Sequence, residues 1–538
     1  MKIKKTYLEV LVFLAVYLFA IYMWTLPFQD NNVPYGEWDA VSHWELADFI
    51  AQRDRTFVYL PPFLDYSYGN DNRFKPHTLW YHPPFHTDMA IISAFAQDRM
   101  VPIYFTNAVF ASSILISIFF VIRKLFGFLP AILSSFMLTF SIRDIMPYLW
   151  GQWPERFGYA FIPLILYCFY MYFTTYTKDK NKPLYLYLMG VLLAVGLMIH
   201  PLSFFHSLVG LFVLGVALLI KLRKIPFNWK HIGIAAALFL ILFAVFPYQT
   251  GNVFKTFSRE QELDESKIVF SRLFKWSFDP EKFSGSVPAA YFSFKDMHGT
   301  WTLPFLLIGI FALALRRQNK DIFLLAWLVS LYLVLHRDVI GKIELLHRSL
   351  SATAHIFVPI TVVGVFLIIS FIKIPKTYKL FLKYSFGILI VALTLTYNMP
   401  QAYSTLDKAY DSPIIRLNPA QIEVSEWLKD NIDENENVSV IGPPSQIMQK
   451  AWWMASYSHR VSHYFEGFLI WGTFEENREE TIKNHLLNDY LVFDYTDIAM
   501  LSDRSFVERW LEFEKQNMGN HTLLYNKDNI RVYKYEAS

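Results

Sequence analysis

The chain has 538 residues, of which 54% are hydrophobic, 18% are aromatic and only 18% are charged. One soluble core cannot bury this much apolar surface, so the composition favours a membrane protein. The net charge of +3 gives nucleic-acid binding little support, and the single cysteine excludes both an intrachain disulfide framework and a cysteine-based zinc site.

Apolar runs predict about eleven transmembrane helices, since a helix needs about 20 mostly apolar residues to cross a bilayer. The first run follows a basic start and has no small-residue cleavage pattern after it, so we expect a retained helix. In chain order the runs lie near residues 6–28, 102–122, 126–145, 157–176, 183–199, 203–222, 231–248, 300–316, 321–336, 352–372 and 379–398.

The distribution of Lys and Arg predicts the orientation. Basic residues recur in every second connection, near residues 2–5, 123–124, 178–182, 221–230, 316–320 and 373–383. Short cytoplasmic loops carry such an excess, so we expect a cytoplasmic N-terminus. An odd number of spans then places the C-terminus on the extracytoplasmic side, together with the long connections 29–101 and 249–299.

The composition changes to a mixed globular pattern after Pro400. A helix is predicted at Glu423–Asn431 and another at Phe506–Gln516, alternating with strands near 438–442, 490–494, 522–525 and 530–535. The sequence therefore predicts a polytopic α-helical membrane domain over residues 1–399 and a small extracytoplasmic α/β soluble domain over residues 400–538.

Two carboxylates stand just beyond the first predicted span, where Glu37 and Asp39 precede a predicted amphipathic helix over residues 40–50. At such a helix N-terminus they could hold a divalent cation or take a proton from an acceptor hydroxyl or amide. The alternative is that Asp39 only caps the helix and Glu37 is solvated.

The motif Glu37-Trp38-Asp39, followed by His43, resembles the first acidic motif of the GT-C superfamily of membrane glycosyltransferases. It is similar to the Glu-aromatic-Asp of oligosaccharyltransferase catalytic subunits. The resemblance implies that Asp39 is the catalytic or metal-binding carboxylate, with Glu37 as its neighbour. Members of that superfamily also begin in the cytoplasm and often end in an external soluble domain.

A second resemblance lies later in the same connection. Tyr81-His82-Pro83-Pro84 is similar to the His-Pro-Pro motif of protein O-mannosyltransferases and aminoarabinose transferases. The alternative is a kinked entry to a membrane helix, with His82 and His86 as interfacial residues. Metal binding by His82, His86 and Asp88 is a further alternative.

The next predicted extracytoplasmic connection contains Asp144, Glu155 and Arg156, on the same side of the membrane as Glu37. In oligosaccharyltransferases a second acidic motif occupies this place. The resemblance implies that Glu155 is a second metal or donor-site carboxylate, although Trp-Pro-Glu-Arg departs from that family's pattern. A surface Glu-Arg pair without function is the alternative.

Arg348 precedes the tenth predicted span, where a guanidinium could bind the phosphate of a lipid-linked donor in a bidentate manner. Similar enzymes place a phosphate-binding arginine before a late helix, which makes Arg348 the donor-phosphate candidate and His347 the second. A lipid-headgroup anchor is the alternative for Arg348. For His200-Pro201, a helix-ending His-Pro is the simpler interpretation.

The sequence thus predicts a glycosyltransferase that moves a sugar from a polyprenyl phosphate or pyrophosphate to a protein, lipid or glycan acceptor at the outer face. Asp39 and Glu155 could hold Mn²⁺ or Mg²⁺, while His43, His82, Asp144 and Arg156 support the site. Trp452-Trp453-Met454 lacks the Trp-Trp-Asp of oligosaccharyltransferases, which argues against protein N-glycosylation. The alternatives are a non-catalytic lipid-binding scaffold and a transporter.

Overall fold

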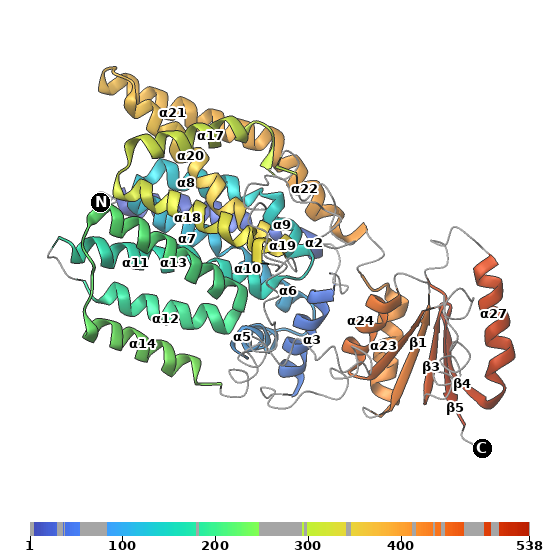
Figure 1. Cartoon of the computed structure of the whole chain (residues 1–538). Coiled ribbons are helices and arrows are strands. Elements are labelled where there is room, and N and C mark those ends of the chain that lie inside the picture. The colour runs from blue at the N-terminus through green and yellow to red at the C-terminus, as the bar shows by residue number, and fades with distance from the viewer. Residues whose placement is uncertain are drawn as a thin grey trace. The chain divides into compact units, whose positions relative to one another are not determined.

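The computed structural model of the chain forms two compact units (Figure 1). The first, here called the helical unit, comprises Met1–Leu26, Trp80–Phe85 and Phe105–Asp407. The second, the mixed unit, comprises Pro27–Leu79, His86–Tyr104 and Lys408–Ser538. The structure describes residues 5–29, 36, 38–53, 83–178, 182–246, 293–294, 298–340, 346–411, 416–433, 436–442, 447–466, 489–496 and 505–536.

Each of the eleven predicted apolar runs contains a helix, and the run near 126–145 is divided between two helices. The elements of the helical unit are α1 (Lys5–Trp24), α7 (Ile114–Phe126), α8 (Phe128–Thr139), α9 (Ile142–Leu149), α10 (Trp153–Tyr159), α11 (Ile162–Tyr176), α12 (Leu184–Ile199), α13 (Pro201–Leu222), α14 (Trp229–Phe243), α17 (Thr302–Arg316), α18 (Asn319–Leu335), η6 (Arg337–Ile340), α19 (Leu346–Leu350), α20 (Thr353–Phe371), α21 (Lys376–Leu393), the π-helix η7 (Thr394–Asn398) and α22 (Met399–Asp407). Short helices that contribute to both units are α2 (Leu26–Gln29), α5 (Pro84–Ser93) and α6 (Val101–Ser112).

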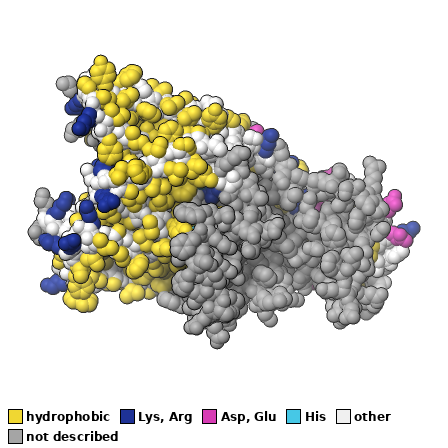
Figure 2. Space-filling view, turned by 45° about the horizontal axis from the view of Figure 1, so that its top comes forward, with side chains coloured by type: hydrophobic (Ala, Val, Ile, Leu, Met, Phe, Trp, Pro, Cys, Tyr) yellow, Lys and Arg dark blue, Asp and Glu magenta, His cyan; other side chains and the backbone are white. Residues whose placement is uncertain are grey.

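Within the described ranges, six helical segments are long and apolar enough to cross a membrane. They are Lys5–Trp24, Val101–Phe126, Trp153–Tyr176, Pro201–Leu222, Arg348–Phe371 and Lys376–Asp407. The pair α8 and α9 bends by 45° and makes a seventh if it counts as one span, and α12, α14 and α17 are shorter apolar helices. Hydrophobic side chains cover much of the visible surface of this unit (Figure 2). The chain is therefore an integral membrane protein.

The central helix of the helical unit is α20, which is buried over most of its length, whereas α1 and α21 expose their apolar residues outward. Small residues allow α17 and α20 to approach closely. A Cβ added to Gly364 would lie 2.2 Å from the Cα of Gly309, so only glycine fits this crossing. Close backbone approach at small residues is a general means of helix association in membranes.

The mixed unit contains a five-stranded sheet in the order β2-β1-β3-β5-β4. Strands β1, β2 and β3 are parallel, while β5 pairs antiparallel with both β3 and β4. The predicted α/β fold is confirmed, but β2 and the helix before it were missed. The strands are β1 (Asn437–Gly442), β2 (Val461–Glu466), β3 (Tyr490–Asp494), β4 (His521–Lys527) and β5 (Ile530–Tyr535).

The helices of the mixed unit begin with α3, which follows the first span. Its elements are α3 (Trp38–Arg53), η8 (Lys408–Asp411), α23 (Pro419–Asn431), α24 (Ile447–Ser458), α27 (Ser505–Asn517) and η10 (Met518–Asn520). The start of α23 is fixed by a capping box, because Asn418 and Gln421 each accept a hydrogen bond from the other's backbone N–H at 2.9 Å. Helix α3 packs on α24, where Trp44 stacks on Tyr457 at a ring distance of 5.6 Å.

Candidate functional site

Ionisable side chains gather inside the helical unit where four helices begin. Asp144 lies in the first turn of α9, Glu155 in the first turn of α10, Arg348 on α19 and His355 in the first turn of α20. Asp144, Glu155 and His355 are at most 1% exposed. Charged groups buried to this degree are costly unless they are paired, so their partners define the site.

Asp144 has two partners, a hydrogen-bonding histidine and an ion-paired arginine. Its Oδ1 is 2.8 Å from His355 Nε2, and its Oδ2 is 3.1 Å from the same nitrogen. Arg156 Nη1 forms an ion pair with Oδ1. Because an ionised carboxylate can only accept, His355 Nε2 carries the proton in this arrangement. The three side chains form one buried group, here called the Asp144 group.

Glu155 lies beside the Asp144 group and faces Arg348. Its Oε1 accepts a hydrogen bond of 2.8 Å from the hydroxyl of Tyr159, and its Oε2 is 3.9 Å from Arg348 Nη1. The Tyr159 hydroxyl also lies 3.4 Å from the Arg348 carbonyl oxygen. The Arg348 side chain is 17% exposed and that of Glu155 1%, so the guanidinium lies at the rim of a buried carboxylate.

Two histidines of the His200-Pro201 segment have structural partners. His200 caps α13, since its Nδ1 accepts a hydrogen bond of 3.2 Å from Leu202 N, in agreement with the simpler interpretation. His206 Nε2 is 3.1 Å from the Ser349 hydroxyl, and its ring packs against Tyr159 at 5.1 Å. His206 therefore ties α13 to the short helix that carries Arg348.

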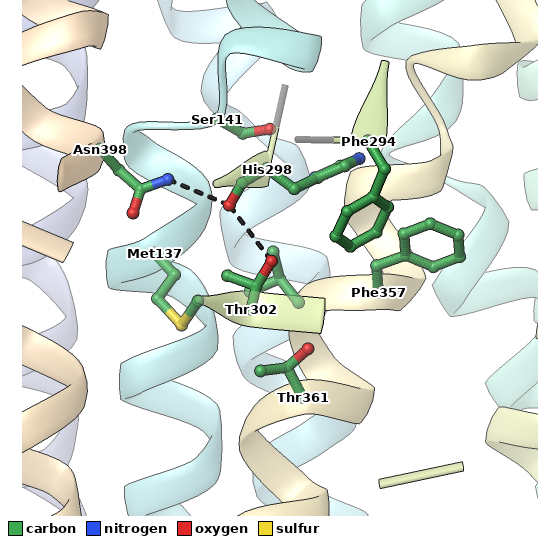
Figure 3. A pocket seen from close by; sticks show the side chains of 9 residues that line it. Met137, Ser141, Phe294, His298, Thr302, Phe357, Thr361 and Asn398 are labelled. Carbon is green, nitrogen blue, oxygen red and sulfur yellow. Dashed lines mark hydrogen bonds between the residues drawn. The ribbon is translucent and has the colours of Figure 1, made fainter. Parts of the chain in front are cut away.

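A small cavity of about 20 Å³ lies between α8, α17, α20 and η7, next to the start of α9 (Figure 3). Ser141, three residues before Asp144, and Phe357, two residues after His355, contribute to its walls. At one side the carbonyl oxygen of His298 accepts hydrogen bonds from the Thr302 hydroxyl and the Asn398 amide (Figure 3). The cavity has room for about one water molecule, so it cannot hold a sugar.

The mixed unit has its own buried charge network, centred on Asp48 of α3. Arg99 donates to both carboxylate oxygens, at 3.1 and 2.6 Å, and His459 Nε2 lies 2.8 Å from Oδ2. Burial opposes the charge of Asp48, but the hydrogen bond from His459 and the charge of Arg99 outweigh it and lower its pKa to about 2. Burial also lowers the pKa of His459, so a neutral imidazole donates this bond.

The Asp48 network joins α3 to α24 and does not resemble a reaction centre. The Arg99 guanidinium lies 4.2 Å from the centre of the Tyr457 ring and donates a hydrogen bond of 3.0 Å to the Tyr457 carbonyl oxygen. Each hydrogen bond named here has a protein group as its acceptor, either the Asp48 carboxylate or the Tyr457 carbonyl oxygen. We infer that the network holds α3, the helix with Asp39 in its first turn, in place.

The predicted residues of the first connection are partly described. Asp39 lies in the first turn of α3 and is half-buried. His43 is buried, and its Nδ1 lies 3.0 Å from His86 Nε2. Burial lowers the pKa of His86 to about 3, so it is neutral at physiological pH. Glu37, His82 and the side chain of His347 lie outside the described residues.

The predicted metal site stays a prediction. Asp39 belongs to the mixed unit and Glu155 to the helical unit. In the part of the chain that the structure describes, no three His, Cys, Asp or Glu side chains come together as a metal site. Carboxylate oxygens at these two positions have the chemistry that Mn²⁺ and Mg²⁺ prefer.

The structure brings Asp144, Glu155, Arg156 and Arg348 together, as one cluster of four residues predicted for the site. The sequence reasoning missed His355, which joins Asp144 to α20. A signal was present, because an ionisable residue inside an apolar helix usually faces the bundle interior and carries a function.

Comparisons with known proteins agree with this architecture. The sequence model of a family described as a family of unknown function (DUF6541) matches residues 3–353. A search of the curated proteins found no match.

Two solved structures are similar over nearly the whole chain. The oligosaccharyltransferase AglB of the archaeon Archaeoglobus fulgidus, in complex with an inhibitory peptide and a dolichol-phosphate, is 13% identical with a TM-score of 0.60. The match covers 99% of this chain and 74% of AglB. ArnT from Cupriavidus metallidurans, bound to undecaprenyl phosphate, is 9% identical with a TM-score of 0.54, and the match covers 99% of this chain and 98% of ArnT. Both are GT-C glycosyltransferases, so this chain has a GT-C-like fold.

Proposed function

Because the chain belongs to the DUF6541 family of unknown function and has a GT-C-like fold, we propose that it is a glycosyltransferase with a lipid-linked donor. The sugar would pass from a polyprenyl phosphate or pyrophosphate to a protein, lipid or glycan acceptor at the outer membrane face. The observation that carries the proposal is the cluster at the start of α9, α10, α19 and α20, where the buried carboxylate of Glu155 lies 3.9 Å from Arg348 at a partly exposed rim.

Arg348 is the proposed ligand of the donor phosphate. A guanidinium matches phosphate in a bidentate manner and keeps its charge at any physiological pH. Arg348 Nη1 lies 3.9 Å from Glu155 Oε2, and the arginine side chain is 17% exposed, so solvent and an incoming anion can reach it. His347 is the proposed second phosphate ligand.

The Asp144 group is the proposed support of this site. Asp144 balances the charge of Arg156, and His355 joins the pair to the first turn of the central helix. The ion pair of Asp144 with Arg156 and its contact with His355 link α9, α10 and α20 to one another. Arg156 and Asp144 are therefore positioning residues in the proposal, and His43 supports α3 in the same sense through His86.

Asp39 is the proposed base. It would orient the acceptor nucleophile, which attacks the anomeric carbon while the bond between that carbon and the phosphate oxygen breaks. The acceptor proton passes to the Asp39 carboxylate, and the electron pair of the broken bond leaves with the polyprenyl phosphate. Glu37 would support Asp39, and Arg348 would stabilise the negative charge of the leaving phosphate. His82 is a proposed neighbour of this site.

Mn²⁺ or Mg²⁺ is the proposed metal, with oxygen ligands from Asp39 and Glu155. A bound divalent ion would add positive charge next to the donor phosphate.

The proposed orientation has the N-terminus in the cytoplasm and the mixed unit outside. Most visible Lys and Arg side chains of the helical unit gather at the end that carries the N-terminus, as a cytoplasmic surface requires (Figures 1 and 2). His355 lies in the first turn of α20 and Phe371 is its last residue, so the two residues lie at opposite ends of the helix. The proposed site then belongs to the extracytoplasmic half of the helical unit.

Donor binding by the purified protein tests the role of Arg348. The proposal predicts that Arg348→Gln weakens binding of an undecaprenyl phosphate probe by tenfold or more, and that Arg348→Lys recovers only part of it. Arg223→Gln removes an arginine at the other end of the helical unit and serves as the matched control. Equal donor affinity in the Arg348→Gln and Arg223→Gln variants would contradict the proposed phosphate site.

A further inference from the structure

A second pocket of the helical unit lies where α1, α18 and α21 begin and α7 and α17 end. Its volume is about 480 Å³. This volume falls within the range of roughly 300–1,000 Å³ that is typical of small-molecule sites. The pocket is therefore large enough for a ligand, unlike the cavity of about 20 Å³ beside the Asp144 group.

This second pocket is here called the basic pocket, because lysine and arginine side chains line it. It is separate from the proposed glycosyltransferase site. Helix α20 contributes His355 to the Asp144 group and Ser370 to the basic pocket, and the two residues are fifteen positions apart in the helix. At 1.5 Å per residue the two positions are about 22 Å apart along the helix axis. The phosphate of a ligand in one site therefore lies far from the other site.

The lining of the basic pocket carries excess positive charge. Lys5, Arg316, Lys320 and Lys383 line it, against the single carboxylate of Glu9. Four cations and one carboxylate leave a net lining charge of +3. Glu9 is itself neutralised, because Arg123 Nε donates a hydrogen bond of 2.8 Å to its Oε2.

Lys320 and Lys383 carry the inference, because the other two cations of the lining have carboxylate partners. Arg316 forms an ion pair with Asp321, and Lys5 lies 4.0 Å from Glu9. Neither Lys320 nor Lys383 makes an ion pair with a carboxylate among the described residues, and both are half-buried in the pocket. Lys320 instead lies 5.2 Å from the centre of the Phe126 ring. A half-buried pair of ammonium groups without a carboxylate partner is suited to an anionic ligand.

The remaining walls are apolar and continue onto the outer surface of the unit. Phe366 and Leu367 of α20 line the pocket, as do Leu380 and Tyr384 of α21. Leu380 and Tyr384 are more than half exposed, at 51% and 53%, on a helical segment that is long and apolar enough to cross a membrane. A ligand in this pocket meets ammonium groups at one end and hydrocarbon at the other.

We propose that the basic pocket binds an anionic phospholipid, with its phosphate between Lys320 and Lys383 and its acyl chains against α20 and α21. Basic pockets between membrane helices recognise acidic headgroups in this way. The apolar margin favours a lipid over a soluble phosphate. The site does not depend on glycosyl transfer, so its test is independent of the proposed function.

The test measures lipid binding to the purified full-length protein by native mass spectrometry. The probes are phosphatidylglycerol, phosphatidylcholine and water-soluble glycerol 3-phosphate. The test variant is Lys320→Gln/Lys383→Gln. Its matched control, Lys178→Gln/Lys221→Gln, removes two exposed lysines that do not line the pocket. All four positions are partly or fully exposed, so both variants should fold, as checked by gel filtration and circular dichroism.

The proposal predicts that the wild type and the control variant prefer phosphatidylglycerol to phosphatidylcholine. The pocket variant should bind phosphatidylglycerol roughly 30-fold more weakly, the equivalent of about 1 kcal/mol for each lysine removed. An equal loss in both variants, or no loss in either, would overturn the pocket as the site. Competition by glycerol 3-phosphate as strong as that by the lipid would assign the pocket to a soluble phosphate and overturn the lipid.

Discussion

The Asp144→Asn substitution tests whether the charges of the helical unit are paired as described. The change removes the negative charge but keeps the size of the side chain. It leaves the Arg156 guanidinium, which is fully buried, without its carboxylate. Breaking a buried ion pair in this way costs about 3–5 kcal/mol, because the remaining charge is buried without compensation.

The double variant Asp144→Asn/Arg156→Met provides the internal check. Replacing both partners by groups of similar volume removes the uncompensated charge, so the double variant should be more stable than Asp144→Asn alone. Reversible unfolding in detergent mixtures gives the free energy of unfolding for each variant. The exposed pair Glu423 and Lys527 supplies the control, since Glu423→Gln should cost only about 0–1 kcal/mol.

Two results would refute this reasoning. One is a loss of stability in Asp144→Asn no greater than in Glu423→Gln. The other is strict additivity of Asp144→Asn and Arg156→Met, since partners in contact must show a coupling energy.

Three further predictions follow from other parts of the structure. Gly364→Val should destabilise the crossing with Gly309 by about 1–3 kcal/mol in detergent unfolding, whereas Gly233→Ala, whose Cβ would meet nothing within 4 Å, should not. Asp48 has a pKa of about 2 in the folded protein against an ordinary value of 3.8. Its ionised form therefore stabilises the folded state above pH about 4, and this contribution is lost as the pH falls toward 2. The loss of melting temperature over this interval should therefore be smaller in Asp48→Asn, and an unchanged profile would contradict the Asp48 network. Removal of divalent ions with EDTA should abolish sugar transfer and Mn²⁺ or Mg²⁺ should restore it, while full transfer in EDTA would exclude the proposed metal.

The helices could be predicted from the sequence because the bilayer imposes a length and an apolar composition on each span. The α/β fold of the C-terminal part was also predictable, because predicted helices alternate with predicted strands along this part of the sequence. Strand β2 was missed, because Val461–Glu466 contains Ser462, His463 and Glu466 and has no long apolar run. Its place in the sheet comes from parallel pairing with β1, which is a tertiary property.

The candidate site was only partly predictable. Arg348 and Glu155 were named from their residue types and their place next to predicted spans, and the structure pairs them at 3.9 Å. The sequence could not show that Arg156 pairs with Asp144, nor that His355, 211 residues away in the chain, completes the group. Such partners depend on how the helices pack, and no local pattern encodes them.

The central claim is tested most directly by sugar transfer from a mixed pool of radiolabelled polyprenyl-linked donors with the purified protein. The wild type is compared with Asp39→Asn, and with Asp430→Asn, an exposed aspartate of α23, as the control. The proposal predicts transfer by the wild type and the control, and a loss of at least a hundredfold in Asp39→Asn, the smallest effect expected for a general base. Transfer at near-normal rates by Asp39→Asn would contradict the proposed base, and donor binding without any turnover by the wild type would identify a lipid-binding scaffold instead of an enzyme.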